Sequence, residues 1–345
     1  MAKLIIHIPC FNEAATLPAA LKELPRQVPG FDVVEWMVTD DGSTDDTAAV
    51  ARASGVDHVN RLPRNRGLAA AFMTGIIAAL RAGADVIVNT DADNQYDPSC
   101  IPDLVAPIVE GRAEMVIGAR PIADTAEFSW LKKRLQEAGS WAVRMASGTD
   151  VPDAPSGFRA FSRDVAMRLY VFNAYTYTLE TIIQAGRLGM TVTSVPVRTN
   201  PAMRPSRLMR SIRSYVWRSV VTILRIFVLY KPVRFFALCG AVVAVPGVLL
   251  GLRFLYFYLT GGGAGNVQSL ILVAVLLISS VIIFAAGLLS DLVAANRTLL
   301  AEIRTNQLRA ELEGRAANPP ANPLASPPAN PLANPPDGHG APGGR

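Results

Sequence analysis

Short apolar runs alternate with longer amphipathic stretches over the first half of the chain. Leu4 to Ile8 is an apolar run that Pro9 ends, and residues 15–24 then carry apolar side chains at helical spacing. The same order recurs, and it predicts further strands at 33–38, 86–89 and 114–117 and further helices at 44–53, 68–82 and 102–110. This alternation is typical of an α/β domain in which helices cover both faces of a parallel sheet.

The second half of the chain shows two other patterns. Residues 235–252 and 270–289 contain no charged side chain, and each run is long enough to cross a bilayer core, which takes about 20 residues. Before them, residues 207–230 carry apolar side chains on one helical face and arginines on the opposite face. We expect this basic amphipathic helix to lie in the membrane interface, and the alternative is a helix that packs on the first domain.

These patterns divide the chain into consecutive parts. They are an α/β domain at 1–205, a basic amphipathic helix at 206–231, transmembrane helices at 232–259 and 268–291, a helical segment at 292–314 and a tail at 315–345. The repeated Asn-Pro and Pro-Pro units of the tail cannot build a core and predict disorder. Arginines follow the second span, whereas the segment between the spans is uncharged. The positive-inside tendency therefore predicts a cell-membrane protein with two spans, whose α/β domain and both termini are cytoplasmic.

Charge and cysteine content narrow the class of partner. The chain carries a net charge of +5, and its basic residues crowd just before the first span. They are Arg207, Arg210, Arg213, Arg218, Arg225, Lys231 and Arg234. This placement favours contact with a membrane surface over contact with a nucleic acid. The 3 cysteines show no paired spacing, which argues against a disulfide framework or a zinc site and fits a reducing compartment.

Polar residues fill the loops that follow three of the predicted strands. Ligands of parallel sheets bind at the carboxyl ends of the strands, so these loops are the expected place for chemistry. Asp91 and Asp93 follow the strand at 86–89, and two carboxylates at such a turn can converge on one hard divalent cation whose other ligands are phosphate oxygens. A solvated loop or a helix cap explains most Asp-x-Asp triplets that stand alone, so the neighbouring motifs decide whether this one is a metal site.

Four motifs supply that context. They are Ile8-Pro-Cys-Phe-Asn-Glu13, Thr39-Asp-Asp-Gly-Ser-Thr-Asp45, Asp91-Ala-Asp-Asn-Gln95 and Ser156-Gly-Phe-Arg-Ala-Phe-Ser-Arg163. The first three together resemble family 2 glycosyltransferases of GT-A fold. Within that family, with the fourth as a further match, the chain most resembles the branch of dolichyl-phosphate mannose synthases and polyprenyl-phosphate glycosyltransferases. The resemblance covers residues 4–200, and paired C-terminal spans also occur in that branch. It implies a Rossmann-like, mostly parallel sheet in the catalytic domain.

The resemblance implies a site for a nucleotide-sugar donor and a divalent metal, Mg²⁺ or Mn²⁺, which Asp91 and Asp93 would hold. The residues implied in donor binding are Pro9, Phe11, Glu13, Asp40, Asp41, Gly67, Asp91 and Gln95. Acidic side chains can accept hydrogen bonds from ribose hydroxyls, and a glycine before a helix lets the backbone approach an anion. For Asp40 and Asp41 the alternative is an Asx turn with helix capping, and Asp41 is the expected ligand contact.

The resemblance also implies three residues at the acceptor phosphate, Arg159, Arg204 and Arg207. Arg207 stands where the branch more often has lysine. An ion pair that stabilises the domain is the alternative role for Arg159. Asp153 is the candidate that orients or deprotonates the acceptor, although a phosphate oxygen is already anionic near neutral pH and needs little help from a base. Asp93, Asp153 and Arg159 are therefore the expected catalytic residues.

The expected function is metal-dependent, inverting transfer of a hexose from a UDP- or GDP-linked donor to a polyprenyl phosphate at the cytoplasmic membrane face. The expected partners are the donor, the lipid acceptor and the bilayer, with no nucleic acid, and homo-oligomerisation stays open. One alternative is a processive polysaccharide synthase, but the Gln-x-x-Arg-Trp motif of those enzymes does not occur in the chain. The other is a non-catalytic membrane protein that binds a nucleotide-sugar, which the intact Asp91 and Asp93 disfavour.

Overall fold

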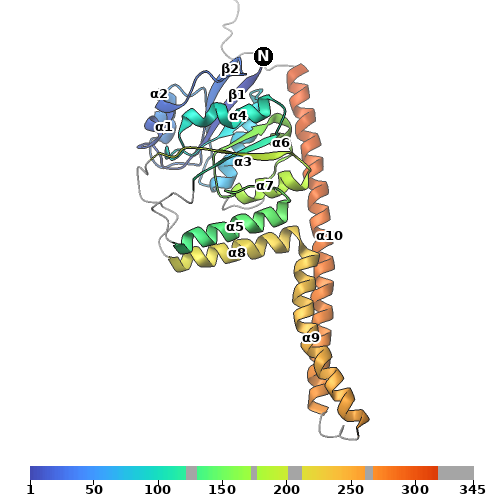
Figure 1. The fold of residues 1–345 in the computed structure, drawn as a ribbon. Helices are drawn as coiled ribbons and strands as arrows, with labels where there is room; N and C mark the ends of the chain where they lie inside the picture. Colours follow the sequence, from blue (N-terminus) through green and yellow to red (C-terminus); the bar gives the residue numbers. More distant parts are fainter. Residues whose placement is uncertain (122–129, 172–176, 201–211, 261–266, 318–345) are drawn as a thin grey trace, which may run out of the picture.

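A computed structural model describes residues 1–121, 130–171, 177–200, 212–260 and 267–317. An α/β domain lies against one end of a long helical hairpin, and two helices lie side by side below the domain, steeply inclined to the hairpin (Figure 1). The predicted acceptor residues Arg204 and Arg207 and most of the predicted tail lie outside the described residues.

The α/β domain contains one mixed sheet of seven strands in the order β3-β2-β1-β4-β6-β5-β7. The strands are β1 (Lys3–Cys10), β2 (Val33–Asp40), β3 (His58–Arg61), β4 (Val86–Asn89), β5 (Met115–Ala119), β6 (Arg159–Ser162) and β7 (Val192–Pro196). β1 pairs in parallel with β2 and β4, whereas β6 runs antiparallel to both of its neighbours, β4 and β5. The predicted α/β class with a mostly parallel sheet is therefore confirmed.

Helices cover both faces of this sheet. They are α1 (Leu17–Glu23), α2 (Thr47–Ala53), α3 (Leu68–Arg81), α4 (Ile101–Val109), α6 (Arg163–Arg168) and α7 (Thr178–Arg187), with a 3-10 turn η1 (Pro98–Cys100) before α4. Successive side chains of a strand point to opposite faces, so Leu4 and Ile6 of β1 enter one core and Ile5 the other. Phe72 of α3 packs into the core that holds Ile5, and Leu104 of α4 packs into the opposite one.

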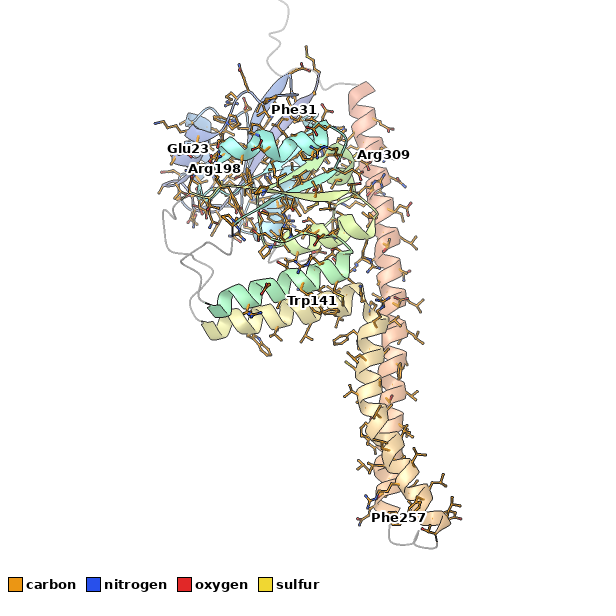
Figure 2. All side chains as sticks on the ribbon, viewed as in Figure 1. Glu23, Phe31, Trp141, Arg198, Phe257 and Arg309 are labelled. Carbon is orange, nitrogen blue, oxygen red and sulfur yellow. The ribbon has the colours of Figure 1, made fainter. Side chains whose placement is uncertain are left out.

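The hairpin consists of α9 (Pro232–Leu259) and α10 (Val267–Ala317). Both helices are long and apolar enough to cross a membrane, and only 11% and 17% of their most apolar stretches are buried. Their side chains radiate into the space around the hairpin (Figure 2), as expected for helices that face lipid and not for the core of a soluble domain. α10 continues without interruption through the predicted boundary between the second span and the following helical segment.

The last part of α10 returns to the α/β domain. Leu308 and Leu312 are buried in the same core as Ile5, and Glu311 accepts hydrogen bonds from Arg81 of α3 at 2.9 and 3.0 Å. Arg309 lies 3.5 Å from a carboxylate oxygen of Asp164 of α6. One helix therefore connects the hairpin directly to the domain that carries the site.

The two helices below the domain are α5 (Trp130–Ser147) and α8 (Ile212–Tyr230), as Figure 1 shows. The rings of Trp141 and Phe227 contact each other between them at a centroid distance of 6.4 Å. α8 thus packs on the domain through α5, as the alternative expectation had it. It also exposes large apolar side chains, among them Trp217 at 70%, so placement in the membrane interface stays a prediction.

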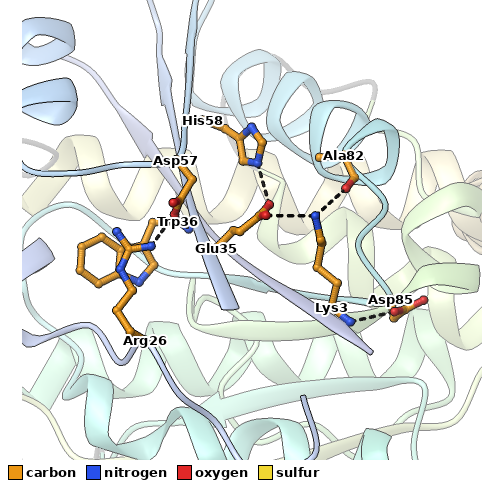
Figure 3. A network of polar contacts seen from close by, with 8 residues as sticks. All are labelled: Lys3, Arg26, Glu35, Trp36, Asp57, His58, Ala82 and Asp85. Atoms are coloured by element: carbon orange, nitrogen blue, oxygen red, sulfur yellow. Dashed lines mark hydrogen bonds and ion pairs between the residues drawn. The ribbon is translucent and has the colours of Figure 1, made fainter. Parts of the chain in front are cut away.

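A network of charged residues joins the amino ends of the strands (Figure 3). Lys3 of β1 donates to Glu35 of β2 at 3.0 Å, and the other carboxylate oxygen of Glu35 lies 2.7 Å from a ring nitrogen of His58 of β3. Beside them, Asp57 pairs with Arg26, whose guanidinium stacks 3.5 Å above the Trp36 ring. Charges at this end of the sheet are paired within the fold.

Candidate functional site

The carboxyl ends of β1, β2 and β4 meet at one edge of the sheet, as the predicted alternation requires. Cys10 lies opposite Asp40 in the parallel ladder, and the loops that follow them are joined. The backbone N–H of Asn12 donates to Ser43 Oγ at 2.9 Å, and that of Glu13 donates to Thr47 Oγ1 at 2.9 Å. The first two motifs therefore form one continuous surface at this edge.

The donor residues predicted on β1 and its loop occupy different environments. Pro9 lies within β1, and Phe11 is 38% exposed at the rim. Glu13 is only 9% exposed, and its Oε2 accepts a hydrogen bond from Thr16 Oγ1 at 2.6 Å. A partly exposed ring and a held carboxylate suit contact with a base and a ribose, and these roles stay predictions.

Asp40 and Asp41 organise the backbone around them. Asp40 Oδ1 accepts a hydrogen bond from the N–H of Ser43 at 2.8 Å, which closes an Asx-type turn. The two oxygens of Asp41 accept from the N–H groups of Arg66 and Gly67, both at 2.8 Å. Asp41 therefore clamps the loop before α3, where Gly67 adopts a positive φ of 92° that favours glycine. The structure shows a loop-holding role for Asp41, and direct ligand contact stays a prediction.

Asp91 and Asp93 follow β4 at the centre of this edge. Asp93 Oδ1 accepts from the N–H of Gln95 at 3.1 Å, which tightens the turn. The donor-binding role of the Gln95 side chain stays a prediction. Burial, and then the neighbouring Asp93 charge, raise the pKa of Asp91 to about 7, whereas Arg120 and Arg159 act in the opposite direction.

This pair of carboxylates suits a divalent cation. The repulsion that raises the pKa of Asp91 is the kind that a bound cation removes. Among the described residues there is no group of three or more His, Cys, Asp and Glu that could hold a metal by itself. Mg²⁺ is commonly bound by one or two carboxylates plus substrate phosphates, so a two-carboxylate site completed by a diphosphate fits these residues.

The fourth predicted motif lies directly against Asp91. A Cβ atom placed on Gly157 would come within 2.8 Å of Asp91 Oδ2, so glycine permits the approach. The hydroxyl of Tyr96 accepts from the N–H of Gly157 at 3.0 Å, and its ring stacks on Phe158 at 5.1 Å. The structure thus brings the third and fourth motifs together.

An arginine that the sequence reasoning missed pairs with Asp153. Arg120 Nε and Nη2 donate to the two carboxylate oxygens of Asp153 at 2.7 and 3.0 Å, and the Asp153 side chain is only 1% exposed. Burial opposes the charge of Arg120, but Tyr96 and Asp153 outweigh it, so the pKa of Arg120 lies above its usual value. Both oxygens of Asp153 thus hold Arg120 in place, and the role of Asp153 toward the acceptor stays a prediction. Arg120 directly follows β5, so the expectation that ligands bind at the carboxyl ends of the strands applies to it as well.

Arg159 lies at the same edge because β6 runs antiparallel to β4 and places its first residue opposite Asn89. Its side chain is fully buried and donates to the carbonyl oxygens of Ala154, Ser156 and Thr178 and to Thr181 Oγ1, at 2.6 to 2.7 Å. Burial lowers the pKa of Arg159 to about 10, so it stays charged at neutral pH. Arg159 therefore holds the Ser156 loop against α7, and its catalytic and acceptor-phosphate roles stay predictions.

A buried chain of polar groups, which the sequence patterns did not predict, lies beneath the site. His7 of β1 lies 3.0 Å from both Asn89 Oδ1 and Thr39 Oγ1, and Asn89 donates to the Tyr177 hydroxyl at 2.7 Å. Burial lowers the pKa of His7 to about 4, so the ring is neutral at physiological pH. A Cβ on Gly75 would lie 1.9 Å from His7 Nε2, so glycine is required there.

Comparison with known proteins agrees with these motifs. Residues 5–170 match the family model described as glycosyl transferase family 2. The undecaprenyl-phosphate mannosyltransferase of Micrococcus luteus is 30% identical over 56% of this chain and 82% of its own length. The polyprenol monophosphomannose synthase of Mycolicibacterium smegmatis is 27% identical over 56% of this chain and 76% of its own length.

A solved structure agrees at the level of the fold. Glucosyl-3-phosphoglycerate synthase from Mycobacterium tuberculosis superposes with a TM-score of 0.52 and 24% identity, covering 66% of this chain and 79% of that one. The expected GT-A architecture is confirmed by this likeness. The family match and the relatives together show that the chain belongs to glycosyltransferase family 2.

Proposed function

We propose that this glycosyltransferase moves a hexose from a UDP- or GDP-linked donor to a polyprenyl phosphate, with inversion at the sugar. The observation that carries the proposal is the Asp91 and Asp93 pair at the end of β4, packed against Gly157 and close to the Arg120 and Asp153 pair. The names of the Micrococcus and Mycolicibacterium relatives, whose acceptors are polyprenyl phosphates, support the acceptor class.

The proposed chemistry needs no strong base in the protein. A phosphate oxygen of the acceptor attacks the anomeric carbon, a new carbon–oxygen bond forms, and the bond to the nucleoside diphosphate breaks with its electron pair on the departing oxygen. A divalent cation held by Asp91 and Asp93 would offset the charge that gathers on the diphosphate. Arg120 lies close enough to Asp91 for their charges to interact, so its guanidinium, although paired with Asp153, would help to stabilise the leaving group.

A panel of labelled nucleotide-sugars tests this proposal. Membranes that contain the full-length protein are incubated with each donor and with Mg²⁺ or Mn²⁺, and the chloroform-soluble product is analysed. We expect one donor to label a lipid, and we expect EDTA to stop the reaction. A labelled polymer would support the processive alternative, and donor binding without any transfer would support the non-catalytic one.

We further propose that the hairpin crosses the membrane and that the catalytic domain is cytoplasmic. The low burial of the two apolar helices supports the spans, and the arginines that follow the second span support the orientation. In a protein without its native cysteines, Thr260→Cys should react with an impermeant thiol reagent from outside intact cells, and Glu313→Cys should not. The reverse labelling would place the domain outside.

A further inference from the structure

A pocket of about 360 Å³ lies where the hairpin meets the domain, away from the Asp91 edge. Its polar lining comes from the end of α7, the junction of α8 with α9, and α10, and consists of Arg187, Tyr230, Lys231, Arg234 and Asp291. The proposed sugar transfer uses none of these residues. The pocket is therefore a separate feature of the molecule.

The pocket lies at the depth where both candidate spans end. α9 begins at Pro232, which also lines the pocket. Asp291 lies on α10 just beyond the uncharged run 270–289. If the hairpin crosses a bilayer, this is the level of the lipid headgroups on the side of the catalytic domain.

The charges of the lining are unbalanced. Arg187, Lys231 and Arg234 supply three positive charges, and Asp291 supplies one negative charge. Arg187 and Lys231 donate hydrogen bonds to the backbone oxygens of Tyr230 and Met145, and none of the four charged residues forms an ion pair with another described residue. In addition, the first turn of α9 has no side-chain cap, and the partial positive charge of that helix end faces the same region.

We propose that this pocket binds the phosphate headgroup of an anionic glycerophospholipid of the bilayer. Basic pockets beside transmembrane helices on the cytoplasmic side suit such headgroups, and the forked guanidinium of Arg234 suits phosphate oxygens. Small-molecule pockets have volumes of about 300 to 1,000 Å³, so a headgroup fits the observed volume. The proposal depends on the hairpin spanning a membrane and not on the identity of the sugar or the acceptor.

A lipid in this pocket would add a bridge between α7 and the first span, beside the direct contact that α10 makes with the domain. Arg187 belongs to α7, whose first turn holds Arg159 at the catalytic edge through Thr178 and Thr181. Arg234 belongs to the first span. A phosphate bound by both arginines would therefore fix the catalytic domain against the hairpin.

Native mass spectrometry of the full-length, delipidated protein in detergent tests the proposal with phosphatidylglycerol as the probe. We expect one tightly bound phosphatidylglycerol that phosphatidylcholine does not replace. Arg234→Ala should weaken its binding about fivefold, the effect of one basic residue at a membrane surface. The matched control is Arg225→Ala, which removes the same charge from an exposed position of α8 outside the pocket and should change binding less than twofold.

A variant with the opposite expected effect keeps the test decisive if Arg234→Ala fails to fold. Asp291→Asn removes the negative charge of the lining and should tighten phosphatidylglycerol binding. Equal losses in Arg234→Ala and Arg225→Ala would show general attraction and overturn the proposal. Equal binding of phosphatidylcholine, full competition by soluble glycerol 3-phosphate, or preferential binding of a polyprenyl phosphate would overturn it too.

Discussion

At the amino ends of the strands Glu35 and Asp57 bond to cations of the same fold, whereas at the carboxyl ends Asp91 lies beside the like charge of Asp93. Burial raises the pKa of Glu35, but hydrogen bonds from His58 and Lys3 outweigh it and leave that pKa below its usual value. Burial and Asp93 both raise the pKa of Asp91, to about 7. The first arrangement contributes to stability, and the second leaves a charge that a ligand can neutralise.

The same contrast separates two kinds of arginine at the catalytic edge. Arg159 has its guanidinium bonded to four oxygens of its own domain and is fully buried. Arg120 is 15% exposed and pairs with one carboxylate, Asp153. The four bonds of Arg159 hold it within the fold, whereas the exposed fraction of Arg120 leaves part of its side chain open to a ligand.

The largest effect should come from Asp93→Asn, which removes one of the two expected metal ligands. We expect no measurable transfer, since loss of a group one shell further from a metal already costs about 10- to 100-fold. The melting temperature should hold or rise, because the repulsion of Asp91 disappears. The matched variant at the other end, Asp57→Asn, should keep full transfer. Transfer by Asp93→Asn at the wild-type rate would exclude this residue from the site.

The next effect is on stability. Arg120→Ala should lower the free energy of unfolding by about 3 to 5 kcal/mol, because it removes the guanidinium that pairs with the buried Asp153 carboxylate. Chemical denaturation of the full-length protein in detergent measures this. Arg112→Ala is the control, since that arginine pairs with Glu110 at the surface, and such pairs contribute about 0 to 1 kcal/mol. Similar small losses in both variants would show that the Arg120 pair is solvated.

A third variant tests the contact between the two motifs at Asp91. The added methyl group of Gly157→Ala would lie 2.8 Å from Asp91 Oδ2 and 3.1 Å from the Tyr177 hydroxyl, so the carboxylate must move. Misplacement of a catalytic group by about 1 Å can lower kcat about a hundredfold. Gly139→Ala on α5 is the control, because a Cβ there meets no atom within 4 Å. Equal kcat values in the two variants would contradict the contact.

Patterns of apolar residues predicted the strands and helices whose own sequences are mostly apolar. β4 coincides with the predicted run, and β2 extends the predicted run by Thr39 and Asp40, since most side chains of both strands are apolar. β6 and β7 were not predicted: β6 begins with an arginine, and β7 carries partly exposed threonine and serine. Such strands form because neighbouring strands complete their hydrogen bonds, which a local pattern does not record.

The motifs likewise located the catalytic edge but not its internal partners. Asp91 and Asp93 were found because one strand precedes both of them. The His7, Asn89 and Tyr177 chain joins residues 82 and 88 positions apart, and the Arg120 and Asp153 pair spans 33 positions. Only the tertiary fold brings these groups together, so no spacing in the sequence reveals which of them pair.

The smallest expected effect concerns the paired end of the sheet and its dependence on pH. The pKa of Glu35 is lowered in the folded state, so its ionised carboxylate stabilises the fold. This contribution to stability is fully present above the ordinary pKa of about 4.3. That contribution is lost as the pH falls through the lowered pKa. Because the Lys3 and His58 contacts are partly open to solvent, we expect them to contribute about 1 kcal/mol or less to the free energy of unfolding.

The Glu35→Gln variant should therefore unfold slightly more easily than wild type at pH 6, and the difference in the free energy of unfolding should shrink toward pH 3. An undiminished difference at pH 3 would show that Glu35 stabilises the fold by packing and not by charge, and the contrast with Asp91 would then rest on the catalytic end alone.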